Sequence, residues 1–336
     1  FTAMRDGADL LLHGEVSPSL LRNLEEFIAA WSHWLPEKYR AIGIGADTEH
    51  EPDLDASRPA LVAFSGGADA AFTVYRHRKG LAGRGKENVR AGVFVHGFDI
   101  PLEENSVFEN AARKAQSMLE SLGLELIPLR SNFRELGENW NETHGAGVAC
   151  CLMVLQGGFG TGLIGSTEPY RALILPWGSN PITDPLLGGS SFRIVHDGAA
   201  FTRSAKIETL AEWTEARRYL RVCWKGDHKD RNCGKCEKCI RTILNFRLTG
   251  YDLPPCFDQD ATDRDILRLR GLTPVPIAYL QEILESAEAT GIRDSWVSAL
   301  RHTIKRNRRA ATGWRKHLRD MRNELGLRKR IAKVFR

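Results

Sequence analysis

The chain has 336 residues and a formal net charge of +5, with 42% apolar and 26% charged residues. This length and composition fit a globular protein with a full hydrophobic core, either one large domain with additions or two smaller domains. No stretch reaches the roughly 18 uncharged apolar residues that a membrane helix requires, so we expect no transmembrane segment.

The seven cysteines are an odd number, and four of them fall between residues 223 and 239, while Cys150 and Cys151 are adjacent. This distribution differs from the paired cysteines of a disulfide-stabilised secreted domain. It therefore predicts a reducing compartment, and we expect a cytoplasmic protein.

Residues 1–57 are predicted to form an accessory segment. A helix is expected after the capping sequence Ser17-Pro18-Ser19, because apolar residues then recur at helical spacing. The stretch 47–59 is rich in acidic residues and proline and is predicted to be a linker. The apolar run 60–64 that follows is typical of a buried parallel strand.

Strand and helix signals alternate beyond this run. In chain order they are a strand at 91–96, a helix at 105–122, a strand at 124–129, a helix at 146–156 and an apolar run that ends at 163–166. This alternation predicts an α/β fold with a doubly wound parallel sheet, spanning residues 58–250. Ligands of such sheets bind beyond the carboxyl ends of the strands. Residues 251–336 are predicted to form a largely helical C-terminal region.

A candidate phosphate-binding loop follows the first strand of this domain. Its residues are Ser65, Gly66, Gly67, Ala68 and Asp69. A glycine-rich turn between a strand and a helix exposes backbone N–H groups, and the helix N-terminus adds partial positive charge. The loop lacks the Lys-Ser/Thr of the Walker motif and the third glycine of the dinucleotide fingerprint. An ordinary turn is the alternative interpretation.

Four cysteines with the spacing C-x9-C-x2-C-x2-C form the most specific pattern in the chain. They are Cys223, Cys233, Cys236 and Cys239. Four thiolates close a tetrahedron around Zn²⁺ and leave no position for water, so the predicted site is structural. An iron–sulfur cluster and unliganded thiols are the alternatives.

Both motifs resemble those of the PP-loop ATP pyrophosphatases. The pattern of that superfamily is Ser-Gly-Gly-x-Asp-Ser, and this chain has Ser65-Gly66-Gly67-Ala68-Asp69-Ala70, without the final hydroxyl. The cysteine segment is similar to the zinc segment of the 7-cyano-7-deazaguanine synthases, including Trp224 and Gly226 after the first cysteine and Arg241 after the last. The resemblance covers residues 58–250.

The resemblance implies an enzyme that activates a carboxylate with ATP, forming AMP and pyrophosphate, on the way to an amide or a nitrile. ATP would bind at the residues 65–69, with Mg²⁺ at its phosphates and structural Zn²⁺ at the cysteines. The implied catalytic residues are Asp69, Arg203 and Lys206, because the family uses basic residues at a helix start to contact the leaving pyrophosphate. For the two basic residues, a merely solvated position is the alternative.

Three further residues are predicted to bind the nucleotide. They are His96, Phe98 and Gly165, at the ends of two predicted strands. In the families that this chain resembles, the strand end near His96 holds the adenine and ribose, and Phe98 would stack on the base. A core position is the alternative for Phe98.

The substrate pocket is expected to be walled by the polar loops 165–170 and 176–185, for which a surface loop without function is the alternative. His144 and Gly145 are predicted to open a helix beside the substrate. Cys150 and Cys151, inside that helix, are predicted to be buried small apolar residues, with a catalytic thiol as the alternative.

Residues 301–336 carry 14 Lys or Arg and two acidic residues, whereas the rest of the chain is acidic. This arm is predicted to be an amphipathic helix that binds nucleic acid, an anionic surface or an acidic partner, or one that packs on the protein's own acidic body. The alternative functions are therefore a tRNA-modifying PP-loop enzyme that uses the arm and a non-catalytic nucleotide-binding protein. The carboxylate could belong to a small molecule or a protein terminus, and a homodimer is one option for the assembly.

Overall fold

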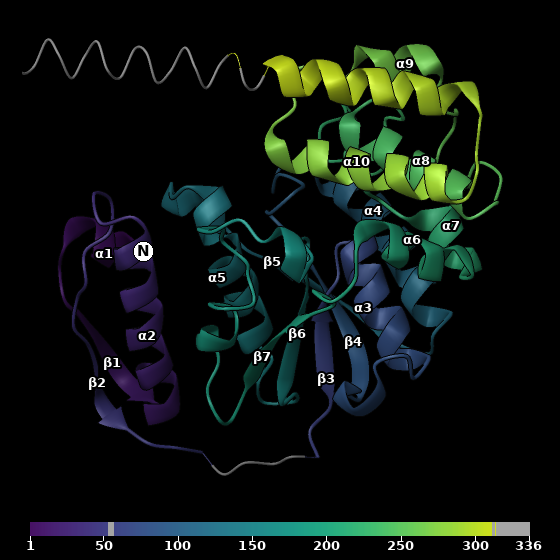
Figure 1. Ribbon diagram of the computed structural model, residues 1–336. Helices are drawn as coiled ribbons and strands as arrows, with labels where there is room; N and C mark the ends of the chain where they lie inside the picture. The colour runs from purple at the N-terminus through teal and green to yellow at the C-terminus, as the bar shows by residue number, and fades with distance from the viewer. Residues whose placement is uncertain (53–56, 311–312, 314–336) are drawn as a thin grey trace, which may run out of the picture. The chain divides into compact units, whose positions relative to one another are not determined.

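The computed structural model describes residues 1–52, 57–310 and 313 (Figure 1). The chain divides into two compact units, of which the first comprises residues 1–232 and 254–256 and the second residues 233–253 and 257–336. The boundaries expected from the sequence lay at 57/58 and 250/251. The N-terminal segment instead belongs to the first unit, and the second unit begins within the cysteine segment.

The first unit is an α/β fold built on a five-stranded, all-parallel sheet, which confirms the predicted class (Figure 1). In the order β5-β4-β3-β6-β7, its strands are β5 (Glu125–Arg130), β4 (Val89–His96), β3 (Ala60–Ala63), β6 (Thr161–Gly165) and β7 (Arg193–Asp197). The apolar residues of β3 are buried, as expected for a central parallel strand covered on both faces. The strand order reverses between β3 and β6, and such a reversal is where ligands bind in open parallel sheets.

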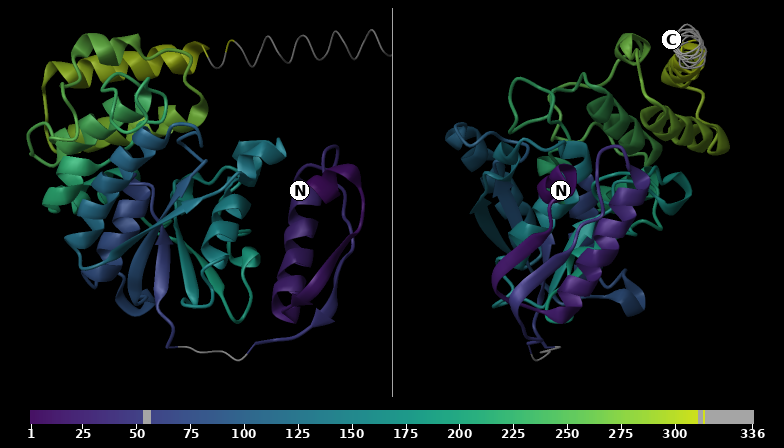
Figure 2. Two further views of the ribbon diagram at one scale, coloured as in Figure 1. Left: turned by 180° about the vertical axis from the view of Figure 1, so that it is seen from behind. Right: turned by 90° about the vertical axis from the view of Figure 1, so that its left-hand side faces the viewer.

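Helices cover both faces of this sheet (Figures 1 and 2). They are α3 (Ala68–Arg78), α4 (Asn105–Glu120), α5 (Trp140–Met153), α6 (Arg203–Ala211) and α7 (Thr214–Tyr219). Helix α5 packs on one side of β6 and α3 on the other, and α6 packs against α3. Short 3-10 turns lie in the connections at Gly83–Gly85, Phe133–Leu136, Tyr170–Ala172 and Pro185–Leu187.

The N-terminal segment of the first unit is a small β-α-β element preceded by α1 (Thr2–Asp6). Strands β1 (Leu10–Val16) and β2 (Ile44–Glu49) pair in parallel, and α2 (Pro18–Trp34) lies across them (Figure 2). The Ser17 hydroxyl accepts from the Leu20 N–H at 3.4 Å, so the predicted helix start is confirmed. Apolar side chains of α2 join the same core as those of β3, β4 and α5.

The predicted elements of the central domain are confirmed with shifted ends, except at two places. Helix α5 begins at Trp140, so His144 lies inside the helix instead of opening it. Cys150 is exposed although its neighbour Cys151 is buried, so the prediction that both are buried is wrong for Cys150. Strands β1, β2 and β7 have no counterpart among the predicted elements.

The second unit is helical within its described residues. Its helices are α8 (Glu237–Leu248), α9 (Asp263–Arg268), α10 (Pro274–Ala289) and a helix at 295–310. Apolar residues of α8 and α10 pack together, and the Arg241 guanidinium lies 4.2 Å from the centre of the Tyr279 ring. Most of the basic arm, residues 311–312 and 314–336, lies outside the described residues. Over the part of the chain that is described, no helix is both long and apolar enough to cross a membrane.

Candidate functional site

The loop after β3 has the geometry that its sequence predicts. Gly66 has a φ of +73°, a conformation that side chains rarely adopt, and Gly67 is the N-cap of α3. The Gly67 N–H lies 3.3 Å from the Ser65 hydroxyl, and Ala68 begins the helix. An eleven-residue helix therefore starts directly at a glycine-lined turn, which is the backbone arrangement of an anion-binding helix N-terminus.

The three predicted catalytic residues meet at the start of this helix. The Arg203 guanidinium lies 2.7 Å from Asp69 Oδ2, and the Lys206 ammonium lies 3.1 Å from Asp69 Oδ1. Arg203 and Lys206 occupy one face of the first turn of α6, where the Thr202 hydroxyl caps the helix. The sequence separates Asp69 from its partners by more than 130 residues, and the fold brings them into one cluster.

The charges of this cluster are strongly coupled. Burial acts to raise the pKa of the Asp69 carboxyl, but Arg203 and Lys206 outweigh burial and hold that pKa below its usual range. The Lys206 side chain is 1% exposed and also donates to the Ser166 carbonyl, while Arg203 Nε has no hydrogen-bond partner among the described residues. The cluster thus places two cations beside an anion-binding helix start and leaves one buried donor unused.

Gly165 packs against the backbone of the same turn. A Cβ at Gly165 would lie 2.8 Å from the Asp69 carbonyl group, closer than real Cβ atoms approach. The end of β6 can therefore reach the first turn of α3 only because residue 165 has no side chain. Ala70 and Ala71, where the resembling superfamily has hydroxyl residues, are both buried.

The other two predicted nucleotide residues lie apart from this cluster. His96 is 1% exposed, its Nε2–H donates to the Pro101 carbonyl at 2.7 Å, and its ring stacks on Phe108 at 4.3 Å. Phe98 is also buried, and its ring packs 4.9 Å from Trp140. The structure therefore gives both side chains packing partners, and it joins neither of them to Asp69.

Arg221 is a site residue that the sequence reasoning missed. Its backbone N–H donates to the Gly66 carbonyl at 2.8 Å, and its guanidinium donates to the Ser65 carbonyl at 3.1 Å. The side chain is 5% exposed and also reaches Asp99 at 3.4 Å. Arg221 precedes Cys223 by two residues, and only this proximity to the cysteine motif could have drawn attention to it.

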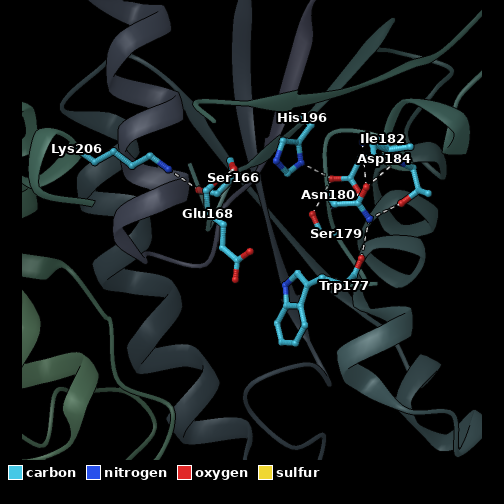
Figure 3. A network of polar contacts seen from close by, with 10 residues as sticks. Ser166, Glu168, Trp177, Ser179, Asn180, Ile182, Asp184, His196 and Lys206 are labelled. Carbon is cyan, nitrogen blue, oxygen red and sulfur yellow. Dashed lines mark hydrogen bonds and ion pairs between the residues drawn. The ribbon is translucent and has the colours of Figure 1, made fainter. Parts of the chain in front are cut away.

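The predicted pocket loop folds around its own polar side chains (Figure 3). The Asn180 amide donates to the Trp177 carbonyl and the Thr183 hydroxyl, both at 2.7 Å, and its oxygen accepts from the N–H groups of Ile182 and Thr183. The carboxylate of Asp184 accepts from the Ser179 hydroxyl at 2.6 Å and from His196 Nδ1 at 2.7 Å. The loop is therefore an ordered structure anchored to β7.

A row of aromatic rings follows this loop along α5. His144 lies 5.3 Å from Trp177 and 5.9 Å from Trp140, and the Arg134 guanidinium lies 4.9 Å from the Trp140 ring. Burial lowers the pKa of His144, although its hydrogen bond to the Trp140 carbonyl acts in the opposite direction. A Cβ added to Gly178 would lie only 2.5 Å from His144 Nδ1, so the loop and α5 are in tight contact at this glycine.

The four predicted metal ligands form one group. The sulfur atoms of Cys223, Cys233, Cys236 and Cys239 all lie within 4.8 Å of one another. Cys233 and Cys239 are 3.8 Å apart, which matches the edge of about 3.8 Å that Zn–S bonds of about 2.3 Å give in a tetrahedron. The backbone N–H of Cys236 points to the Cys233 sulfur at 3.3 Å, which stabilises a thiolate. These residues fit a metal ion, and four sulfur ligands favour zinc.

Fold and site together define an α/β protein of Rossmann-like type, with a glycine-lined turn and a cationic cluster at the carboxyl edge of its parallel sheet, and with a four-cysteine group able to hold a metal ion. No family model matches the chain, and neither a curated protein nor a solved structure matches it.

Proposed function

We propose that the first unit is an ATP pyrophosphatase of the PP-loop kind that adenylates a carboxylate and releases pyrophosphate. The observation that carries this proposal is the contact of Asp69 with Arg203 and Lys206 at the start of α3. In an ordinary turn, two buried cations beside a helix N-terminus would be an unfavourable use of charge, because burial of charge is costly. With a polyphosphate bound, the two cations would neutralise its negative charge.

Each group of the cluster would have a distinct task. The N–H groups in the first turn of α3 would hold phosphate oxygens, and Arg203 Nε offers a further donor. Arg203 and Lys206 would neutralise the charge that develops on the leaving pyrophosphate. Mg²⁺, which prefers carboxylate and phosphate oxygens, would be bound through Asp69 and would lower the charge of the triphosphate. The cysteine group would hold zinc in a structural role.

The reaction would activate the carboxylate of a small molecule or of a protein terminus for amide or nitrile formation. This choice of product rests on the similarity of the cysteine segment to the zinc segment of the 7-cyano-7-deazaguanine synthases, which follows a PP-loop motif in the same order. The loop of residues 176–185 and the aromatic row beside it on α5 would bind the carboxylate-bearing substrate, because the loop follows β6 and bonds through Asp184 to His196 near the carboxyl end of β7.

The test is carboxylate-dependent exchange of pyrophosphate into ATP, together with release of AMP, measured with pools of small-molecule and peptide carboxylates. Replacing Lys206→Met should lower exchange by about 10²- to 10³-fold, since it removes a cation from the developing charge. Lys79→Met, at an exposed position after α3, serves as the matched control and should behave as wild type. If no pool elicits exchange or AMP from the wild-type protein, the proposal is wrong.

A further inference from the structure

A second buried pair of ionisable side chains, Asp184 and His196, has no role in the proposed adenylation. The side chains of Asp184 and His196 are 0% and 3% exposed, and Asp184 Oδ2 lies 2.7 Å from His196 Nδ1. Because a carboxylate only accepts hydrogen bonds, Nδ1 carries the proton of the neutral imidazole. The other ring nitrogen, Nε2, is then a lone-pair acceptor, and it is buried without a partner among the described residues.

The carboxylate that orients this imidazole is itself fixed. Asp184 accepts from the Ser179 hydroxyl at 2.6 Å and from the Asn180 N–H at 3.2 Å, in addition to His196. Three accepted hydrogen bonds define the position of the carboxylate and hence the tautomer of the ring. In Figure 3 the unbonded edge of the ring faces away from Asp184, toward the side on which Ser166 and Glu168 lie.

The register of the sheet places His196 one strand position from the pair of Gly165, which packs on the first turn of α3. His196 pairs with Ile164, and its neighbour Asp197 pairs with Gly165, whose Cβ position is 2.8 Å from the Asp69 carbonyl group. Asp197 bonds to Thr73 and Arg76 of α3, so His196 faces the opposite side of the sheet, toward α5 and the pocket loop. His196 thus faces the loop that is proposed to bind the substrate carboxylate, on the opposite face of the sheet from Arg203 and Lys206.

A comparison within the chain shows that the unpartnered nitrogen is specific to this pair. His77 and Asp197 form a similar buried imidazole–carboxylate contact at 3.2 Å. There the second ring nitrogen, Nδ1, accepts from the Glu87 N–H at 2.9 Å, so the pair is closed, with both ring nitrogens hydrogen-bonded within the protein. In the His196 ring, by contrast, Nδ1 faces the carboxylate, and the second nitrogen, Nε2, has no hydrogen-bond partner among the described residues.

We propose that His196, oriented by Asp184, is the base that deprotonates the nucleophile of this reaction, an amine or ammonia. This inference rests on the proposed adenylation. The attacking nitrogen forms a bond to the acyl carbon of the acyl adenylate, and the bond from that carbon to the AMP oxygen breaks. AMP leaves with the electron pair, and Nε2 takes the proton that the nitrogen loses. The products are the amide, AMP and a protonated imidazole, which returns its proton to water.

The test separates the two half-reactions. With a carboxylate that supports exchange, His196→Gln should keep ATP–pyrophosphate exchange within about threefold and lower the ammonium-dependent rate of amide formation by about 10²- to 10³-fold. The rate of the wild type should rise with pH across one ionisation that the variant lacks. Imidazole added to His196→Ala should restore part of the amide-forming rate, which a purely structural role would not allow.

The pH dependence of the amide-forming rate must be distinguished from the ionisation of other groups near the His196 ring. They are Asp184 itself, His144 on α5 and Glu168 after β6. His77→Gln is the matched control, because it removes a closed pair on the other face, and it should retain the wild-type pH profile. Ser179→Ala, which removes one donor to Asp184, is the milder variant if His196→Gln fails to fold, and it should lower the ratio of the amide-forming rate to the exchange rate.

Each outcome has a defined meaning. If the wild type catalyses exchange, and His196→Gln keeps the wild-type rate and pH profile of amide formation, the base assignment is wrong and the proposed function stands. Absence of exchange in the wild type overturns the proposed function and the base assignment with it. Nitrogen-15 spectra of histidine-labelled protein give a check that needs no substrate, since a proton on Nε2 of neutral His196 would also overturn the assignment.

Discussion

The backbone N–H of Arg221 donates to the Gly66 carbonyl at 2.8 Å, and the guanidinium of the same residue donates to the Ser65 carbonyl. Two peptide groups of the Ser65-Gly66-Gly67 turn are therefore held by one residue from a distant part of the chain. Glycine gives this turn little rigidity of its own, so its shape depends on such outside contacts.

Replacing Arg221→Met should consequently weaken ATP binding. The substitution removes charge-assisted hydrogen bonds worth about 1.5–3 kcal/mol each, and part of this loss will appear as disorder of the turn. We expect the Kd for ATP to rise by about tenfold, measured by calorimetry with Mg²⁺ present. Arg218→Met, at an exposed position on α7, is the control. An Arg221→Met protein that binds ATP as tightly as wild type would show that the turn is rigid without this residue.

Gly165→Ala tests the approach of β6 to the first turn of α3. The added Cβ would lie 2.8 Å from backbone atoms of Asp69, and backbone cannot move aside as a flexible side chain can. We expect a loss of about 1–3 kcal/mol in the free energy of unfolding, the usual cost of overpacking, and weaker ATP binding. Gly157→Ala, where a Cβ would meet nothing within 4 Å, should change neither quantity. Equal stability of the two variants in urea denaturation would refute the packing argument.

The sequence predicted those parts of the fold and site that depend on local patterns. Strand β3 is a continuous apolar run, and Ser65-Gly66-Gly67 marks the turn after it, so both were found. Arg203 and Lys206 were candidates from the sequence because they stand at a helix start, and the structure brings both to Asp69. Strand β7 was missed, since Arg193–Asp197 is short and has charged residues at both ends.

Residues whose roles come from tertiary contacts could not be predicted in this way. Arg221 acts on a turn more than 150 positions earlier in the chain, and no motif links the two. His196 belongs to no sequence motif, and its pairing with Asp184 depends on how the loop folds back on β7. Conversely, the sequence predicted that His96 binds the nucleotide, whereas in the structure its Nε2–H donates to the Pro101 carbonyl and its ring stacks on Phe108.

Removal of the metal should destabilise the region around the cysteines. A structural Zn²⁺ site contributes its binding energy to folding, since the ligands are not assembled in the unfolded chain. We expect about one zinc per chain in the purified protein, and Cys239→Ser should lose that metal and lower the melting temperature. Cys150→Ser, at an exposed cysteine outside the group, should retain both. A zinc content near zero, or iron in its place, would contradict the assignment.

The pH dependence of stability should carry the signature of Asp197. Its carboxylate accepts from Thr73 at 2.9 Å and contacts Arg76 at 2.9 Å and His77 at 3.2 Å. Burial acts to raise the pKa of Asp197, but the hydrogen bond from His77 and the charge of Arg76 outweigh burial and lower the pKa below its usual range. A carboxyl whose pKa is lower in the folded state stabilises the protein above its unfolded pKa of about 3.9, and this contribution disappears as pH falls through the folded pKa.

Asp197→Asn should therefore destabilise the protein most at neutral pH, by about 3 kcal/mol, because it leaves the partly buried Arg76 beside a neutral group. The difference in the free energy of unfolding between wild type and variant should stay constant from pH 7 to about 5 and shrink below pH 4, as the wild-type carboxylate becomes protonated. Urea denaturation across this range measures it. A difference that remains the same at pH 3 as at pH 7 would mean that the charge of Asp197 contributes nothing and that only its shape matters.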